Sequence, residues 1–127
     1  MERAIIDINV IVEDSQYHKK AEEILDSLNK WVIPTIVIHE LVWFLKDMKD
    51  RINDVLAYVR NEKAEVVCDS VNNIVDSLEM LIREKLPLAD YKDMIILSHA
   101  IREKLPLVTF DKKLSKIAKK YGVSVVS

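Results

Sequence analysis

Short apolar segments alternate along this chain with longer segments that carry an apolar residue at every third or fourth position. The short segments, mostly rich in β-branched residues, predict five strands, at residues 4–6, 31–33, 65–68, 105–109 and 123–126. The longer segments predict helices at residues 18–28, 35–48, 53–63, 71–84, 90–104 and 111–121. Strands that alternate with helices in this way indicate an α/β fold, in which helices cover both faces of a parallel sheet.

The heptapeptide IREKLPL occurs twice, at residues 82–88 and 101–107. Each copy is expected to end a helix, because proline disfavours the helical conformation in the residue before it. Thr35 is expected to cap the helix that follows Pro34, and Gly122 to end the last helix in the left-handed conformation. The repeat therefore predicts two similar helix ends, and its spacing matches no tandem-repeat architecture.

The composition fits one folded domain spanning residues 1–127, in which 50% of the residues are hydrophobic and 31% are charged. The apolar runs are too short to span a membrane, and a leader sequence is not expected from the residues before the first predicted strand. The lone Cys68 cannot form an internal disulfide, so a cytoplasmic protein with no membrane partner is expected. A net charge of −2 excludes a generally basic surface but allows a local basic patch.

Two aspartates directly follow predicted strands: Asp7 the first strand and Asp111 the fourth. If the first strand is central and the fourth lies beside it, the two carboxylates are neighbours at the point where strand order reverses, which is where such sheets bind ligands. A single aspartate in this position is most often a turn residue or a helix cap. With two of them at neighbouring strand ends, a ligand-binding role and a capping role remain open.

Two further acidic residues lie on predicted helices among apolar neighbours. Glu40 lies in IVIHELVWFL, and burying its carboxylate without a partner costs several kcal/mol. It therefore requires a basic side chain, a narrow opening to solvent on the helix, or a bound cation. Asp93 shares the inward stripe of its helix with Leu97 and Ala100. Asp90 is expected to be the N-cap of that helix, and Asp93 could also reach back in a capping box.

Four segments, IIDINVIV, IHEL, DMIILSHA and LVTFD, resemble in order and spacing the PIN-domain family of metal-dependent nucleases. Within that family, the chain looks like the VapC-like toxins of type II toxin–antitoxin pairs. The resemblance implies a three-layer α/β/α fold with a five-stranded parallel sheet in the order 3-2-1-4-5. Ile8 departs from the pattern, because the family often has serine or threonine there.

The resemblance implies an acidic quartet of catalytic and metal-binding residues, supported by the polar residues Asn9 and Thr109. The quartet comprises Asp7, Glu40, Asp93 and Asp111. A site with oxygen ligands and without cysteine or histidine suits Mg²⁺ or Mn²⁺. The implied function is a metal-dependent endoribonuclease that acts on RNA, forms a homodimer and is paired with a small antitoxin.

The last predicted helix carries a row of lysines opposite its apolar stripe. Lys112, Lys116 and Lys119 share one face. This face is either an ordinary solvated surface or a site that binds RNA phosphates without sequence specificity.

Other functions remain open for a chain of this length. A phosphoacceptor receiver domain would use Asp69 after the third strand and Thr109 after the fourth, but it also needs an acidic pair after the first strand and a lysine after the fifth. A phosphatase that forms a phosphoaspartate needs a second aspartate where Asn9 stands. A binding module that keeps the fold without catalysis is the third alternative.

Overall fold

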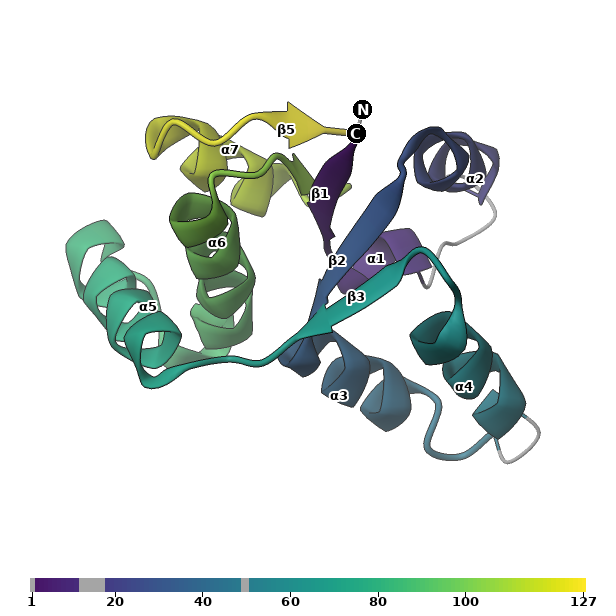
Figure 1. Cartoon of the computed structure of the whole chain (residues 1–127). Helices are drawn as coiled ribbons and strands as arrows, with labels where there is room; N and C mark the ends of the chain where they lie inside the picture. The colour runs from purple at the N-terminus through teal and green to yellow at the C-terminus, as the bar shows by residue number, and fades with distance from the viewer. Residues whose placement is uncertain (1, 12–17, 49–50) are drawn as a thin grey trace.

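A computed structural model describes residues 2–11, 18–48 and 51–127, and Figure 1 shows the arrangement of their helices and strands. Val12, the last residue of the first family-like segment, lies outside these ranges. The elements in chain order are β1 (Arg3–Ile6), α1 (Ile8–Ile11), α2 (His18–Ser27), β2 (Lys30–Pro34), α3 (Thr35–Phe44), α4 (Ile52–Arg60), β3 (Ala64–Val67), α5 (Val71–Glu84), the 3₁₀ turn η2 (Leu88–Asp90), α6 (Tyr91–Glu103), β4 (Leu107–Val108), α7 (Lys112–Lys120) and β5 (Val125–Val126). No helix within the described ranges is long and apolar enough to cross a membrane.

The five strands form one parallel sheet in the order β3-β2-β1-β4-β5, which confirms the predicted order. β1 is the central strand, and Ile5 pairs with Val32 of β2 on one side and with Leu107 of β4 on the other. In Figure 1, α5, α6 and α7 lie on one side of the sheet, and α1, α2 and α4 lie on the other. The carboxyl ends of β1 and β4 are therefore neighbours at the reversal of strand order.

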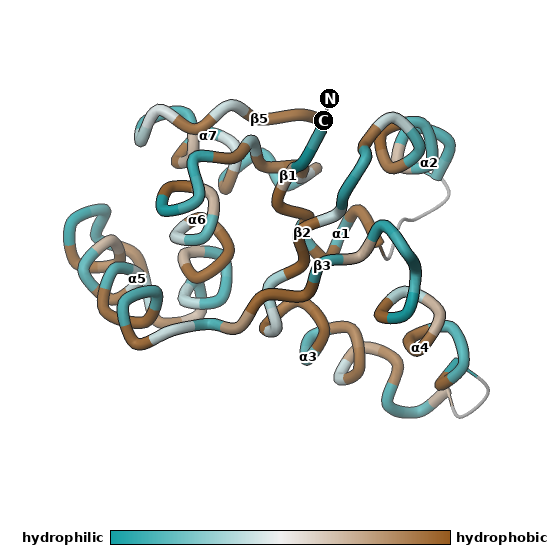
Figure 2. Tube along the Cα trace, in the orientation of Figure 1, coloured by the Kyte–Doolittle hydropathy of each residue, from teal (hydrophilic) through white to brown (hydrophobic). Residues whose placement is uncertain are grey.

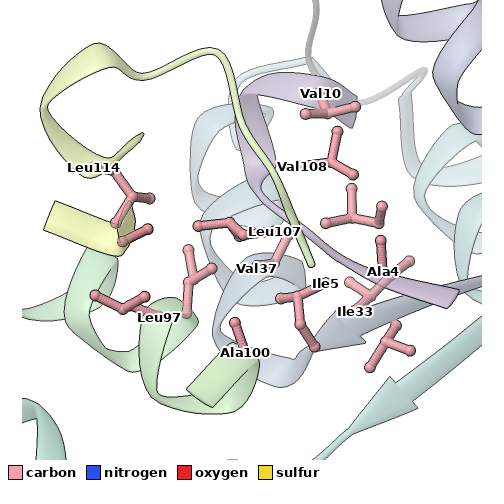
Figure 3. Packing of buried hydrophobic residues seen from close by; sticks show 14 of the residues in the cluster. Ala4, Ile5, Val10, Ile33, Val37, Leu97, Ala100, Leu107, Val108 and Leu114 are labelled. Carbon is pink, nitrogen blue, oxygen red and sulfur yellow. The ribbon is translucent and has the colours of Figure 1, made fainter. Parts of the chain in front are cut away.

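The core forms where the strands and α6 meet. The three apolar residues of β1, Ala4–Ile6, are fully buried, because both faces of a central parallel strand are covered. Every residue of α6 from Met94 to Ala100 is also buried. Figure 2 shows hydrophobic residues along the strands at the centre of the fold, and hydrophilic and hydrophobic residues alternating along outer helices such as α5. Figure 3 shows Val37 of α3 and Leu97 of α6 packed around the strands.

The start of α3 differs from the prediction. Thr35 was expected to supply the N-cap, but the cap position is occupied by Pro34, which makes no side-chain cap bond. Asp69, from the segment after β3, caps the helix instead. Its carboxylate accepts hydrogen bonds from the Ile36 N–H at 3.1 Å and from the Thr35 hydroxyl at 2.8 Å. The helix also ends at Phe44, four residues earlier than the predicted end at Met48.

The start of α6 also differs. Asp90 occupies the N-cap position but makes no side-chain cap bond, so the predicted capping box with Asp93 does not form. The turn η2 leads directly into the helix, and the Asp90 carboxylate accepts a hydrogen bond from the Lys113 ammonium group at 2.7 Å. The Asp93 carboxylate is therefore not used in capping.

The repeated heptapeptide ends α5 and α6 in the same way, as predicted. Lys85 and Lys104 follow the two helices in the left-handed conformation, with φ of 56° and 55°. In each case the next residue closes the helix end: the Leu86 N–H donates to the Leu81 carbonyl, and in the second copy the Leu105 N–H donates to the Ala100 carbonyl. Gly122, with φ of 78°, has the same conformation after α7.

Candidate active site

Four acidic side chains from four different elements lie near one another at the carboxyl edge of the sheet. Asp7 follows β1 and Asp111 precedes α7, whereas Glu40 lies on α3 and Asp93 on α6. The charges of Glu40 and Asp111 each act on Asp7, and the charges of all three act on Asp93. The structure therefore brings the whole predicted quartet within electrostatic reach.

Asp7 is held rigidly in this group. Its side chain is only 2% exposed, and its two oxygens accept hydrogen bonds from the Thr109 hydroxyl and the Ile8 N–H, both at 2.7 Å. Burial raises the pKa of Asp7 to about 6, although both hydrogen bonds act to lower it and the neighbouring acids add only a smaller increase. The carboxylate is thus fixed in position, and its pKa stays raised although Lys92 is near enough for the two charges to interact.

Asp93 is affected more strongly than Asp7. Its pKa is raised to about 7, first by burial and then by the charges of Asp7, Asp111 and Glu40. The positive charge of Lys92 opposes this increase. Near neutral pH, Asp93 is therefore divided between its protonated and ionised forms, and any added cation would favour the ionised form.

Glu40 has the basic partner that its apolar surroundings require, and sequence reasoning did not identify that partner. The Lys92 ammonium group lies 3.0 Å from Oε2 of Glu40, and this pairing raises the pKa of Lys92. Oε1 of Glu40 is buried and has no hydrogen-bond partner among the described residues. The only signal for Lys92 in the sequence is its position beside Asp93, because its partner is 52 positions away on another helix.

Asp111 is a helix cap as well as a member of the acidic group. Its side chain accepts a hydrogen bond from the Leu114 N–H at 3.0 Å, at the start of α7. The capping role that the sequence left open is therefore present. The same carboxylate contributes its charge to Asp7 and Asp93, so the two roles coexist.

Thr109 and Asn9 tie the acidic group to the ends of the strands. The fully buried Thr109 hydroxyl donates to Asp7 and accepts from the Asp111 N–H at 3.0 Å. Asn9 donates to the Thr109 hydroxyl at 3.4 Å and accepts from the Phe110 N–H at 3.1 Å. Asn9 reaches this position because α1, a four-residue helix too short to show a periodic pattern, begins directly after Asp7.

The chemistry of these residues fits a divalent cation bound by oxygen ligands. Within residues 2–11, 18–48 and 51–127, no three acidic, histidine or cysteine side chains are already grouped to hold a metal ion. The fit rests instead on the unpaired, buried Oε1 of Glu40 and on the raised pKa values of Asp7 and Asp93. A bound cation would offer Oε1 of Glu40 a partner and would stabilise the ionised forms of Asp7 and Asp93. Hard oxygen donors favour Mg²⁺ or Mn²⁺ as that cation.

The three predicted lysines lie together in one hollow, and one of them, Lys112, directly follows Asp111 in the chain. Lys112, Lys116 and Lys119 line a hollow of about 520 Å³, into which Lys20 of α2 also faces. The other two lysines of α7 do not contribute to it, because Lys113 pairs with Asp90 and Lys120 with Glu84. Sequence reasoning did not include Lys20, since nothing in the sequence places α2 beside α7.

Asp69, the candidate phosphoacceptor of the receiver-domain alternative, has a structural role. One of its oxygens caps α3, and the other lies 2.7 Å from Nε2 of the buried His99. A phosphoryl group at Asp69 would have to displace these contacts. Thr109 is likewise engaged with Asp7, so the geometry does not favour a receiver domain.

Asp7, Glu40, Asp93 and Asp111, at the carboxyl edge of the sheet, are called the acidic edge from here on. The fold and the acidic edge together define a known class of protein. The sequence matches the family model of the PIN domain over residues 4–120, so the chain belongs to the PIN-domain family. A comparison with curated proteins found no significant sequence match.

Several solved structures have the same fold at low sequence identity. A toxin–antitoxin complex from Klebsiella pneumoniae matches with a TM-score of 0.74 and 21% identity, covering 98% of this chain and 96% of that chain. VapBC2 from Rickettsia felis, bound to a DNA fragment from its promoter, matches with a TM-score of 0.69 and 21% identity, covering 99% of this chain and 98% of that chain. FitAcB from Neisseria gonorrhoeae matches with a TM-score of 0.70 and 17% identity over 100% and 97%.

Proposed function

We propose that this PIN domain is a metal-dependent endoribonuclease that hydrolyses RNA phosphodiester bonds and acts as the toxin of a toxin–antitoxin pair. The observation that carries the proposal is the acidic edge, where burial and mutual repulsion raise the pKa values of two carboxyl groups to about 6 and about 7. A fold gains nothing in stability from such an arrangement, whereas a site for Mg²⁺ or Mn²⁺ requires it.

The residues of the edge divide the chemistry among them. A divalent cation bound there supplies a polarised water and stabilises negative charge on the phosphate. Asp7 and Asp111 would hold that cation, directly or through one water, and Thr109 and Asn9 keep the first of these carboxylates oriented. Asp93 would accept a proton from the attacking water, because a cation bound among Asp7, Asp111 and Glu40 would favour its ionised form.

Glu40 would act on the water molecules of the cation, and the lysine-lined hollow would act on the RNA. Glu40 would share with Asp93 the task of holding water on the cation, through the oxygen that has no partner in the protein. Lys112, Lys116 and Lys119 would bind backbone phosphates and so offset the repulsion between an acidic edge and a polyanion.

A small antitoxin and a second copy of this chain are the proposed protein partners. The structural neighbours are toxin–antitoxin complexes, and α3 exposes Trp43 and Phe44 at 71% and 57% of their surfaces. Exposed aromatic residues on one helix are typical of protein interfaces. We expect the antitoxin to cover the acidic edge and the complex to reside in the cytoplasm, with residues 1–127 acting as a single domain.

The proposal is tested by cleavage of end-labelled single-stranded RNA by purified protein. Asp7→Asn and Asp111→Asn should abolish cleavage without unfolding the protein, because asparagine removes the charge and is also a good helix cap at position 111. Asp76→Asn is the matched control, since that aspartate lies on α5 and pairs at the surface with Arg102. If the wild-type protein binds RNA without cutting it, the chain is a binding module.

A further inference from the structure

The carboxylate of Asp69 joins the two helices that carry Glu40 and Asp93. Its Oδ2 accepts hydrogen bonds from the Thr35 hydroxyl and the Ile36 N–H at the start of α3. Its Oδ1 lies 2.7 Å from Nε2 of His99 on α6, and because a carboxylate only accepts, Nε2 carries the hydrogen and donates it. In Figure 1, the segment that holds Asp69 runs between α6 and α3 on its way from β3 to α5.

The Asp69–His99 pair is shielded from solvent. His99 is 4% exposed, and the side chain of Asp69 is 19% exposed. Breaking such a contact leaves a buried polar group without a partner, and water cannot replace the lost hydrogen bond fully. Arrangements of α3 and α6 that keep this pair intact are therefore strongly favoured.

The same two helices meet again at the acidic edge. Glu40 lies four positions after Ile36 on α3, which is about one turn, and Lys92 lies seven positions before His99 on α6, which is about two turns. The Lys92 ammonium group is 3.0 Å from Oε2 of Glu40. Polar contacts thus join α3 to α6 at two places, about 10 Å apart along the axis of α6.

The acidic edge pushes these helices apart when no cation is bound. The charge of Glu40 contributes to the raised pKa of Asp93, so the two side chains repel each other across the contact of α3 with α6. The Lys92–Glu40 pair opposes this repulsion, but the side chain of Lys92 is 52% exposed and its charge is screened by solvent. The buried pair of Asp69 and His99 is screened much less, so it is the stronger restraint on the separation of the helices.

We infer that Asp69 and His99 are positioning residues, which act from outside the acidic edge to fix Glu40 relative to Asp93 before a cation binds. The inference rests on the proposed function, which it deepens by naming the contact that preorganises the cation site. Ligands that are already in place lose less conformational freedom when the metal binds. Contacts behind the ligands commonly change metal affinity by roughly 10- to 100-fold.

The test measures the affinity for Mn²⁺ at a temperature at which circular dichroism shows every variant to be folded. Only the binding that Asp7→Asn removes is assigned to the acidic edge. His99→Leu replaces the imidazole with an apolar side chain and should weaken Mn²⁺ binding about tenfold. His99→Gln keeps an N–H donor at this position and should recover most of the affinity.

Ser98→Ala is the matched control, because Ser98 is the neighbouring buried residue on α6. Its hydroxyl accepts a hydrogen bond from Asn73 of α5 at 2.9 Å, so the variant breaks a buried contact of α6 without releasing α3. It should leave the Mn²⁺ affinity unchanged even where it lowers the melting temperature. An equal loss of affinity in Ser98→Ala and His99→Leu would overturn the inference, as would no loss in either.

A second measurement needs no metal. Lys92 and His99 lie two turns apart, so their effects on the melting temperature in EDTA should add unless the position of α3 couples them. We expect Lys92→Gln to cost clearly less in the His99→Leu background than in the wild type, because Glu40 has already moved away from Lys92. In the Ser98→Ala background its cost should be unchanged. If His99→Leu does not fold, Thr35→Val replaces it in both measurements, since it removes one of the donors that join Asp69 to α3.

The two measurements separate this inference from the proposed function. Additive losses in EDTA would overturn the inference even if the wild-type protein cleaves RNA with Mn²⁺. Coupled losses together with Mn²⁺ binding that depends on His99 would uphold it even if no RNA is cleaved, and the proposed nuclease activity would then fail alone. A wild-type protein that binds no Mn²⁺ would overturn both.

Discussion

At the scale of single residues, Asp93 is an acidic side chain that the fold places close to other negative charges. It lies on α6, three other acidic residues act on its charge, and the positive charges of Lys92 and Lys113 oppose them. Its pKa of about 7 lies well above that of the unfolded chain, near 3.8. The folded protein therefore holds a proton that the unfolded chain releases between these two pH values.

The first prediction concerns the pH dependence of stability without metal. Because the folded state binds more protons, the free energy of unfolding should fall as the pH rises from about 4 to about 7. Asp93→Asn removes this contribution and should raise the stability at pH 8 by about 2 kcal/mol, a value reduced from the full shift because the group is partly exposed to solvent. The gain should shrink toward pH 4. Thermal melts in EDTA over this pH range measure the gain. If the stability of the two proteins depends on pH in the same way, the pKa of Asp93 is not raised by folding.

The second prediction concerns Lys92, whose ammonium group partly neutralises the acidic edge. Lys92→Gln leaves Glu40 without its partner and should lower the melting temperature in EDTA by roughly 3 °C, equivalent to about 1 kcal/mol. Saturating Mg²⁺ should remove most of this difference, because the cation replaces the missing charge. Equal melts of variant and wild type in EDTA would mean that the pair contributes no stability.

At the scale of helices and strands, local signals predicted the ends that depend on local sequence. The two IREKLPL copies and Gly122 were predicted to end helices, and they do. In each case a residue in the left-handed conformation follows the helix. The start of α3 was predicted wrongly, because its cap comes from Asp69, 33 positions away from the capped N–H of Ile36. No local rule can identify a cap supplied by another segment of the sheet.

The third prediction compares the two aspartates whose roles the structure changed. Asp69→Ala should cost about 2 kcal/mol or more, because it removes the cap of α3 and leaves the buried His99 without its partner. Asp90→Ala should cost less than about 1 kcal/mol, because it only breaks a pair with the exposed Lys113. Urea denaturation measures both. A larger loss for Asp90→Ala would show that its cap position matters despite the missing bond.

At the scale of the whole molecule, the alternation of strands and helices predicted the layers, and the family-like segments predicted the strand order. The layers follow from a pattern that the sequence displays directly, whereas the strand order is what the resemblance to the family implied. The partners of the acidic edge were not predictable, because Lys92 and Glu40 meet only when α6 packs beside α3. The same is true of the hollow, where α2 and α7 are separated by about two thirds of the chain.

The fourth prediction concerns assembly. The exposed Trp43 and Phe44 of α3 and the exposed Ile82 of α5 give the described surface two apolar regions that a partner could cover. Light scattering at tens of micromolar protein, roughly ten times a micromolar dissociation constant, should give the mass of a homodimer. Trp43→Glu and Ile82→Glu, measured in the same way, would locate the interface. A monomer mass for the wild-type protein would remove the dimer from this account.

The most direct measurement is RNA cleavage as a function of divalent metal. Wild-type protein, stripped with EDTA and dialysed, should not cut single-stranded RNA, and adding Mg²⁺ or Mn²⁺ should restore cutting in a saturable manner. Asp7→Asn and Asp93→Asn should remain inactive at every metal concentration, because each removes a charge from the acidic edge. Cleavage that persists in EDTA, or that survives both substitutions, would contradict the central claim that this edge binds a catalytic cation.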